Sequence, residues 1–288
     1  MNLCDYNTIR DLLARHGFHF SKSMGQNFLI DPEVPRRIAE ASGADAGCGV
    51  LEIGPGIGPL TAELAQRAGK VVAVELDRAL LPVLAETMAP YPNVEVVPGD
   101  VLKLDLTAIA AEKFQGLTPI VCANLPYNVT SPILEKLVES PCFTAFTVMI
   151  QREVARRLCA PQGSSEGGSF SLFLQYYMKP ELLFDVPPEK FLPAPKVTSA
   201  VIRCVRRERP AVDVADASFF FKVMRGGFLL RRKTLANSLS AALPGIPKES
   251  IQQAIADMGL PAAVRGEQLT LEDFAALSAA LGREADGD

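Results

Sequence analysis

The sequence predicts an α/β fold with a mostly parallel sheet, followed by a small all-helical domain. Between residues 50 and 205, short β-branched runs alternate with helical patterns. Such alternation is typical of right-handed βαβ crossovers on a parallel sheet. A glycine-rich turn joins the first run to a helical pattern, and beyond Arg206 only helical periodicity continues. These observations favour an α/β domain at 1–207 and a helical domain at 208–288.

In the first domain, predicted strands alternate with predicted helices along the chain. Five parallel strands are expected at 50–53, 71–75, 94–97, 120–123 and 145–150, with helical patterns at 60–68, 79–88 and 132–139. A Gly/Ser-rich loop at 162–168 precedes two later runs, at 170–177 and 197–205, which we expect to be antiparallel strands. The second domain is predicted from helical patterns at 218–230, 233–243, 248–258 and 271–281. The acidic tail after Arg283 is expected to fray.

Composition excludes several classes of protein. The 288 residues are 48% hydrophobic and 22% charged, which suits one sizeable core and a smaller domain. No apolar stretch approaches the roughly 20 residues that span a bilayer, and the first residues lack a signal-peptide pattern. These features predict a cytoplasmic protein. The cysteines form no CxxC pair, and His16 and His19 have no acidic or thiol cluster beside them, so we predict no metal.

Charge is distributed unevenly along the chain. The net charge is -4, which argues against a protein that simply coats nucleic acid. The segment 206–240 nevertheless carries eight basic and three acidic residues, a local charge of +5. Its densest part, residues 231–233, follows an apolar run, as if a packed helix presented one basic turn. Such a run is either a solvated face or a contact for RNA.

The turn after the first strand predicts a nucleoside-containing cofactor. Gly54, Gly56 and Gly58 let a ligand approach the backbone, and the following helix start offers free N–H groups. Nineteen residues after Gly56, the second strand ends in Glu75, where an acid commonly accepts the ribose hydroxyls. The dinucleotide fingerprint G-x-G-x-x-G is absent, because the third glycine falls one place early and Pro59 follows it.

Two further strand ends carry polar groups suited to an amine. Asp100 follows the third strand, where its carboxylate is placed to accept a hydrogen bond from an adenine amine. After the fourth strand come Asn124, Leu125, Pro126 and Tyr127, in which an amide oxygen accepts from an amine and a rigid turn presents a ring to a base. Four such residues alone are also consistent with a structural turn.

A proline-dense loop at 186–195 holds one aromatic residue, Phe191. Proline fixes φ, so this loop is expected to be rigid. Phe191 is then either an exposed wall of the site or a plug in the core beneath the loop.

Taken together, the cofactor residues resemble those of class I S-adenosylmethionine-dependent methyltransferases, which have a Rossmann-like sheet. Over nearly the whole chain, the sequence resembles the bacterial KsgA family of 16S ribosomal RNA adenine dimethyltransferases. The segments that carry the resemblance are 22–29, 54–58, 124–127, 151–158, 186–203, 228–235 and 265–270. Ser23, Met24 and Gly266 depart modestly from the family pattern.

The resemblance implies roles for individual residues. Asn27 and Leu29 are expected to close over S-adenosylmethionine, Gly54 to contact its methionine part, Glu75 its ribose and Asp100 its adenine. It also implies wider sets. The other cofactor-binding residues are Gln26, Gly56, Leu76, Val101 and Asn124; the catalytic residues are Asn124, Leu125, Pro126, Tyr127 and Phe191; and the RNA-binding residues are Arg152, Arg156, Arg225, Arg231, Arg232 and Lys233.

By this resemblance the protein adds two methyl groups to adenine N6 amines, at two adjacent adenines, in 16S RNA within an immature small ribosomal subunit. Nothing in the sequence demands more than a monomer, which is the state we expect. We expect the target adenine to leave its stack and to lie between Tyr127 and Phe191. Alternatives are a 23S RNA adenine dimethylase, a DNA adenine methyltransferase, and an assembly checkpoint factor whose binding outweighs its catalysis. A nicotinamide-dependent oxidoreductase would need the glycine pattern that is absent.

Overall fold

The computed structural model describes residues 1–18 and 26–285. His19, residues 22–25 of the family-like segment and the end of the acidic tail, residues 286–288, lie outside the described part. The chain divides into two compact units, Met1–Ala155 with Glu181–Arg206, and Arg156–Pro180 with Arg207–Asp288. Among the described helices, none is long and apolar enough to cross a membrane.

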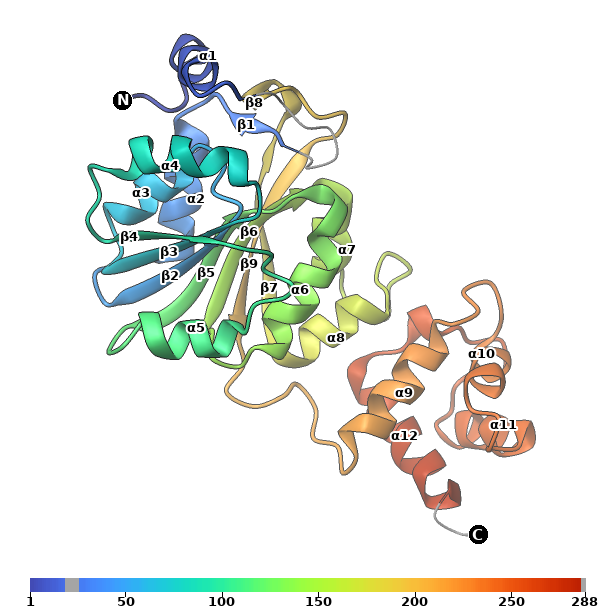
Figure 1. The fold of residues 1–288 in the computed structure, drawn as a ribbon. Coiled ribbons are helices and arrows are strands. Elements are labelled where there is room, and N and C mark those ends of the chain that lie inside the picture. Colours follow the sequence, from blue (N-terminus) through green and yellow to red (C-terminus); the bar gives the residue numbers. More distant parts are fainter. Residues whose placement is uncertain (19–25, 286–288) are drawn as a thin grey trace. The chain divides into compact units, whose positions relative to one another are not determined.

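Within the described residues, the first unit is built on a seven-stranded sheet with the order β4-β3-β2-β5-β6-β9-β7 (Figure 1). The strands from β4 to β6 pair in parallel, and β9 runs antiparallel to β6. The bounds are β2 Cys48–Ile53, β3 Lys70–Glu75, β4 Val94–Pro98, β5 Thr118–Asn124, β6 Ala145–Gln151, β7 Met178–Val186 and β9 Ser199–Arg206. The predicted, mostly parallel α/β sheet is therefore confirmed.

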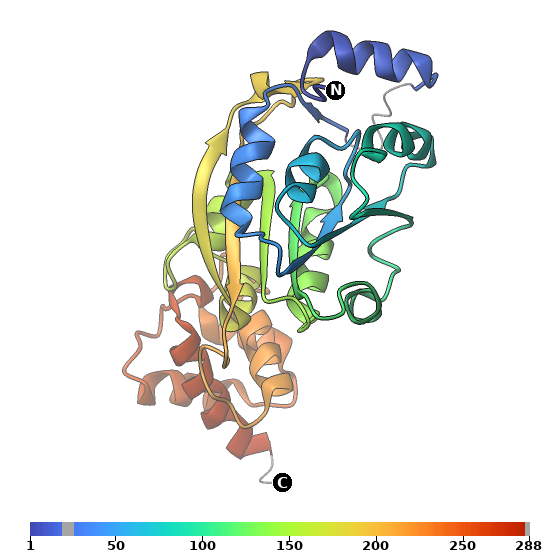
Figure 2. The ribbon, with the colours of Figure 1, turned by 90° about the vertical axis from the view of Figure 1, so that its left-hand side faces the viewer.

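Helices cover both faces of this sheet, which explains why its central strands are apolar almost throughout. Helix α2 lies against β5, β6 and β9, and α5 and α6 lie on the other face (Figure 2). All six residues of β2 are buried, as expected for a parallel strand covered on both sides. The helices of this unit are α1 Tyr6–Arg15, α2 Glu33–Ser42, α3 Pro59–Ala65, α4 Leu81–Met88, α5 Leu106–Lys113 and α6 Thr130–Glu139.

A small second sheet ties the N-terminal segment to the proline-dense loop. Strand β1 (Phe28–Leu29) pairs antiparallel with β8 (Phe191–Leu192). Beside them, the Lys190 ammonium donates to Asp31 at 2.6 Å. This pairing holds the segment that follows residue 25 against a loop more than 150 positions later in the chain.

One predicted strand is wrong: residues 170–177 form helix α8 (Ser169–Tyr177). Nearly the whole middle of α8 is buried, so its apolar run shows neither the alternation of a strand nor the stripe of a surface helix. The strand that follows it, β7, was missed because its residues are mostly exposed or half-buried and include charged ones.

The second unit contains the four predicted C-terminal helices together with α8. Helix α9 (Ala217–Gly227) packs against α8, α10 (Leu235–Ala242) and α12 (Leu271–Ala285), and α11 (Lys248–Asp257) packs against α10 and α12. The aromatic side chains of α8 and α9 form a cluster, in which the Tyr176 and Phe221 rings lie 5.0 Å apart. This cluster explains why residues 156–180 belong to the second unit, although the sequence placed them with the first domain.

Two arginines of the basic segment have structural roles. In the first unit, the Arg206 guanidinium donates to four main-chain carbonyls, those of Leu137, Val138, Ser140 and Phe143, at 2.9–3.2 Å. In the second unit, Arg207 Nε donates to the Gln175 and Met178 carbonyls. The two charged side chains therefore satisfy main-chain carbonyl groups at or near the C-terminal ends of α6 and α8.

We predict that Arg206→Met lowers the free energy of unfolding by roughly 2 kcal/mol, because it leaves half-buried carbonyls without their charged donor. Arg209→Met, at an exposed position, is the matched control and is expected to change stability by less than about 0.5 kcal/mol. Urea denaturation of both variants measures the difference. Equal midpoints for the two variants would contradict this role of Arg206.

Candidate functional site

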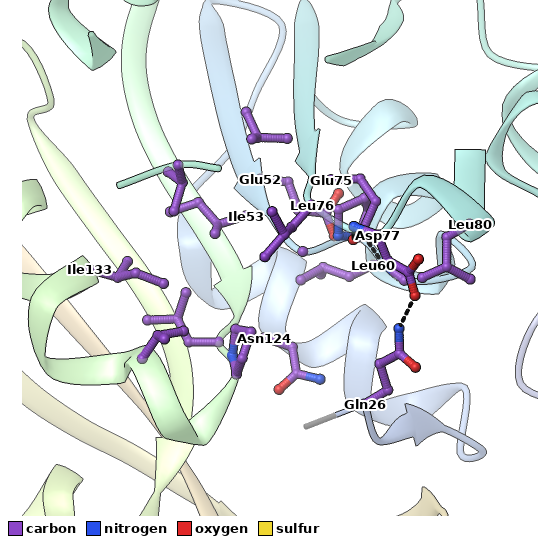
Figure 3. Close-up of a pocket in the computed structure, with 18 of the residues that line it drawn as sticks. Gln26, Glu52, Ile53, Leu60, Glu75, Leu76, Asp77, Leu80, Asn124 and Ile133 are labelled. Atoms are coloured by element: carbon purple, nitrogen blue, oxygen red, sulfur yellow. Dashed lines mark hydrogen bonds between the residues drawn. The ribbon is translucent and has the colours of Figure 1, made fainter. Parts of the chain in front are cut away.

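The carboxyl ends of β2, β3, β4 and β5 open onto one pocket of the first unit (Figure 3). The pocket is open to solvent and has a mostly apolar lining with a few polar groups, as is typical of sites for small ligands. Every cofactor-binding residue predicted from the sequence lines this pocket, namely Gln26, Asn27, Leu29, Gly54, Gly56, Glu75, Leu76, Asp100, Val101 and Asn124. So do Leu125, Pro126 and Tyr127.

The glycine loop takes a backbone conformation that other residues rarely adopt. Gly54, Gly56 and Gly58 have φ of 68°, 62° and 93°. Gly58 precedes α3, and a Cβ there would lie 2.5 Å from the Met88 methyl group. The loop is thus fixed both by its dihedral angles and by close packing.

Glu75 is held in one orientation at the end of β3. Its Oε1 accepts from the Asp77 main-chain N–H at 2.8 Å, and its Oε2 from the Gly56 N–H at 3.3 Å. Burial raises the pKa of Glu75, and these main-chain donors oppose that rise. Each oxygen keeps a second lone pair for a ligand hydroxyl. The next side chain, Leu76, is 54% exposed and offers an apolar surface beside the pocket.

The loop after β4 is braced from another helix. Asp100 Oδ1 accepts from the Leu102 N–H at 3.0 Å, and the Leu102 carbonyl accepts from Lys136 Nζ of α6 at 2.8 Å. Lys136 was not identified from the sequence, because a lone lysine on an amphipathic helix gives no signal. It ties the Asp100 loop to the helix that follows Tyr127.

The turn after β5 has a fixed geometry. The Leu125 N–H donates to the Met149 carbonyl of β6 at 3.1 Å. The Pro126 carbonyl accepts two hydrogen bonds, from Thr130 Oγ1 at 3.0 Å and from the Val129 N–H at 3.3 Å. Asn124, at the end of β5, lies across the pocket from Glu75 in Figure 3.

The Tyr127 hydroxyl is hydrogen-bonded to the Ser199 hydroxyl, which is fully buried on β9. Burial raises the pKa of Tyr127, and the Ser199 hydrogen bond opposes that rise. The ring is therefore neutral over the physiological range and fixed at its far end. Ser199 was also missed from the sequence, since it lies 72 positions away.

The expectation of an exposed Phe191 beside the site is corrected. Phe191 is 3% exposed, pairs with Leu29 across the small sheet, and belongs to the hydrophobic core that contains Ile38 and Val186. It does not line the pocket. The Phe191 ring packs in this core, beside Leu29 of β1. Of the two alternatives predicted from the sequence, the plug in the core beneath the loop is therefore the one observed.

The six predicted RNA-binding residues are divided between the two units. Arg152 and Arg156 lie on α7 (Arg152–Cys159). Arg152 belongs to the first unit and pairs with Asp185 at 3.4 Å, and Arg156 is exposed and is the first residue of the second unit. In the second unit, Arg225 lies 5.9 Å from the Phe173 ring centroid. Arg231, Arg232 and Lys233 are exposed in a turn between α9 and α10, not on a helix. Their role in RNA binding stays a prediction.

A buried carboxyl at the pocket was not recognised from the sequence. Glu52 of β2 is 1% exposed and lines the pocket, and its Oε2 has no hydrogen-bond partner among the described residues. Burial raises its pKa to about 8, and the nearby charge of Glu75 acts in the same direction. A charged residue inside an otherwise apolar strand was the available signal.

Within residues 1–18 and 26–285, no group of three or more His, Cys, Asp or Glu side chains has the arrangement of a metal site. His16 contacts Glu86 at 2.7 Å. The absence of a metal from the function stays a prediction.

The parallel sheet carries a glycine loop after β2, an acid at the end of β3, an aspartate after β4 and an Asn-containing turn after β5. This arrangement defines the class of methyltransferases that use a nucleoside-containing cofactor. The sequence model of the ribosomal RNA adenine dimethylase family matches residues 17–279. The chain belongs to this family, and the resemblance found in the sequence is confirmed.

Similar proteins agree with this assignment. The chain is 48% identical to ribosomal RNA small subunit methyltransferase A of Bacillus mycoides, over 96% of each chain, and equally similar to that of Bacillus anthracis. The crystal structure of the 23S rRNA methyltransferase ErmE is 28% identical, with a TM-score of 0.69 over 89% of this chain and all of that one. A dimethyladenosine transferase from Plasmodium falciparum shares the fold, with a TM-score of 0.76 at 24% identity over 89% of this chain and 98% of that one.

We predict that Glu52→Gln removes part of the pH dependence of stability. The folded-state pKa of about 8 lies above the usual 4.5, so unfolding between these pH values releases a proton and stability falls as pH rises, by up to about 1.4 kcal/mol per pH unit. Glutamine imitates the neutral acid, so the variant should gain stability over the native protein from pH 5 to pH 8. Denaturation midpoints at pH 5, 7 and 9 measure this, and parallel curves would contradict it.

Proposed function

We propose that the protein transfers methyl groups from S-adenosylmethionine to adenine N6 amines of 16S ribosomal RNA in the small subunit, and forms N6,N6-dimethyladenosine at two adjacent adenines. One observation carries the proposal: the Asn124–Tyr127 turn lies on the same pocket as the oriented Glu75 carboxylate and the Gly54–Gly58 loop. Family membership supports the reaction, and the 48% identical small-subunit enzymes support 16S RNA over 23S RNA.

The pocket residues fit S-adenosylmethionine. Both Glu75 oxygens are oriented to accept hydrogen bonds from the ribose hydroxyls, and Asp100 is placed to accept from the adenine amine. Leu76 offers its exposed apolar surface to the ring. The remaining assignments are Gly54 and Gly56 beside the methionine part, Val101 beside the adenine, and Gln26, Asn27 and Leu29 over the cofactor. The bound cofactor supplies a methyl group on a sulfonium, which is a good leaving group.

Asn124 and one main-chain carbonyl accept hydrogen bonds from the target amine. The lone pair of an adenine amine is delocalised into the ring, and two acceptors favour the pyramidal nitrogen that can attack the methyl group. The Pro126 carbonyl already accepts from Thr130 and Val129, so we assign the second acceptor to the Leu125 carbonyl. Positioning then supplies most of the rate, and the proton leaves after the nitrogen has been alkylated.

To reach this pocket the adenine leaves its stack, and Tyr127 replaces one stacking face, a contact worth roughly 1–3 kcal/mol. Phe191 is buried under β1 and is not assigned the other face. Arg152 and Arg156, with Arg225 and the exposed residues Arg231, Arg232 and Lys233, are proposed to contact the RNA of an immature small subunit. We propose that the protein acts in the cytoplasm as a monomer without a metal.

We predict that Asn124→Ala lowers the rate of methyl transfer by roughly 100-fold or more, because it removes one oriented acceptor for the amine. Asn7→Ala, on the exposed face of α1, is the control and should leave the rate unchanged. The measurement is single-turnover formation of dimethyladenosine in immature small subunits at saturating S-adenosylmethionine. Dimethyladenosine formed by Asn124→Ala at the native rate would refute the role of Asn124.

We also predict that Ser199→Ala and Tyr127→Phe each lower kcat/KM for the RNA about tenfold, since either change frees the far end of the Tyr127 ring. The double variant should lose no more than one single variant, and Ser199→Thr should retain most activity. S-Adenosylhomocysteine affinity should not change. Additive losses would show that the two hydroxyls act independently.

A further inference from the structure

Asp77 lies two residues after Glu75, at the point where three hydrogen bonds meet. Its main-chain N–H donates to Glu75 Oε1 at 2.8 Å. Its own Oδ1 accepts from the Ala79 N–H at 2.9 Å, which caps the short helix η2 (Arg78–Leu80). Its Oδ2 accepts from Gln26 Nε2 at 2.7 Å. No pattern in the sequence singles out this residue.

The third bond joins two parts of the chain that are 51 positions apart. Gln26 and Asp77 both line the pocket, and Figure 3 shows the bond between them next to Glu75. Two residues after Gln26, the Phe28 ring packs over the glycine loop, 3.2 Å from where a Cβ on Gly56 would lie. The segment from Gln26 to Leu29 is therefore attached to the wall of the pocket at the Glu75 loop and covers the glycine loop.

The two Asp77 oxygens have separate tasks. Oδ1 accepts a hydrogen bond within its own loop, which orients the carboxylate. In this orientation Oδ2 accepts from the Gln26 amide. Because Asp77 also fixes Glu75 through its main chain, the position of the proposed ribose-binding acid and that of the covering segment depend on one residue.

We propose that Asp77 is a positioning residue that fastens the Gln26–Leu29 segment over the bound cofactor through the Gln26 amide, and so slows exchange of the cofactor. The inference rests on the proposed function, because the ligand is taken to be S-adenosylmethionine or its product. Exchange matters in this reaction: each dimethylated adenine consumes two cofactors, so S-adenosylhomocysteine leaves and S-adenosylmethionine enters between the two transfers.

The experiment measures the dissociation rate constant of labelled S-adenosylhomocysteine from the full-length protein. Gln26→Ala removes the fastening bond without touching Glu75, and should increase this rate constant roughly tenfold, as expected for a hydrogen bond to a charged acceptor. Gln26→Glu places a second carboxylate beside Asp77 and should increase it further. Single-turnover methyl transfer at saturating S-adenosylmethionine should stay within about twofold of the native rate in Gln253→Ala, a control outside the pocket lining.

A matched control is available in the second unit. Gln253 Nε2 donates to Asp257 Oδ1 at the same distance, 2.7 Å, on the exposed surface of α11. Gln253→Ala removes a bond of the same length at a residue outside the pocket lining and should leave dissociation unchanged. Asp77→Asn keeps an oxygen to cap η2 and lets its amide pair with a flipped Gln26 amide, so its dissociation rate should lie between those of the native protein and Gln26→Ala.

Equal dissociation rates for the native protein and Gln26→Ala would overturn the inference while leaving the proposed function intact. So would an equal increase in Gln26→Ala and Gln253→Ala, or a Gln26→Ala variant that lost single-turnover activity with unchanged dissociation. Failure of the native protein to bind S-adenosylhomocysteine at all would overturn both the inference and the proposed function.

Discussion

The site depends on one constraint of the fold: the carboxyl ends of parallel strands meet at the same edge of a sheet. Strands β4, β3, β2 and β5 are neighbours and run in parallel. The residues after each strand therefore converge, although Gly54 and Asn124 are 70 positions apart in sequence. Polar groups can gather there because β2, at the centre of these strands, is buried along its whole length and leaves only its end for a ligand.

Three groups at this edge are held by a partner from a different element. Gly56 holds Glu75, Lys136 braces the Asp100 loop, and Ser199 holds Tyr127. Such cross-element contacts keep the side chains in place before any ligand arrives, which is what positioning catalysis requires. The proposed fastening of Gln26 by Asp77 follows the same plan.

The mostly parallel sheet and the convergence of the candidate cofactor residues on one pocket were predictable because they rest on local patterns and on one rule of topology. Three kinds of feature were not. Residues 170–177 are buried nearly all round in α8, so their sequence has no period to identify a helix. Phe191 is covered by β1 through pairing over a long sequence separation. The partners Ser199 and Asp77 act through contacts with positions 72 and 51 residues away, which composition does not show.

The most direct test of the central claim supplies labelled S-adenosylmethionine to the native protein with immature small ribosomal subunits, large subunits and DNA in parallel. The labelled nucleosides are then identified. The account predicts N6,N6-dimethyladenosine in the 16S RNA of the small subunit alone. Label in 23S RNA or DNA, or no transfer to the small subunit, would contradict it.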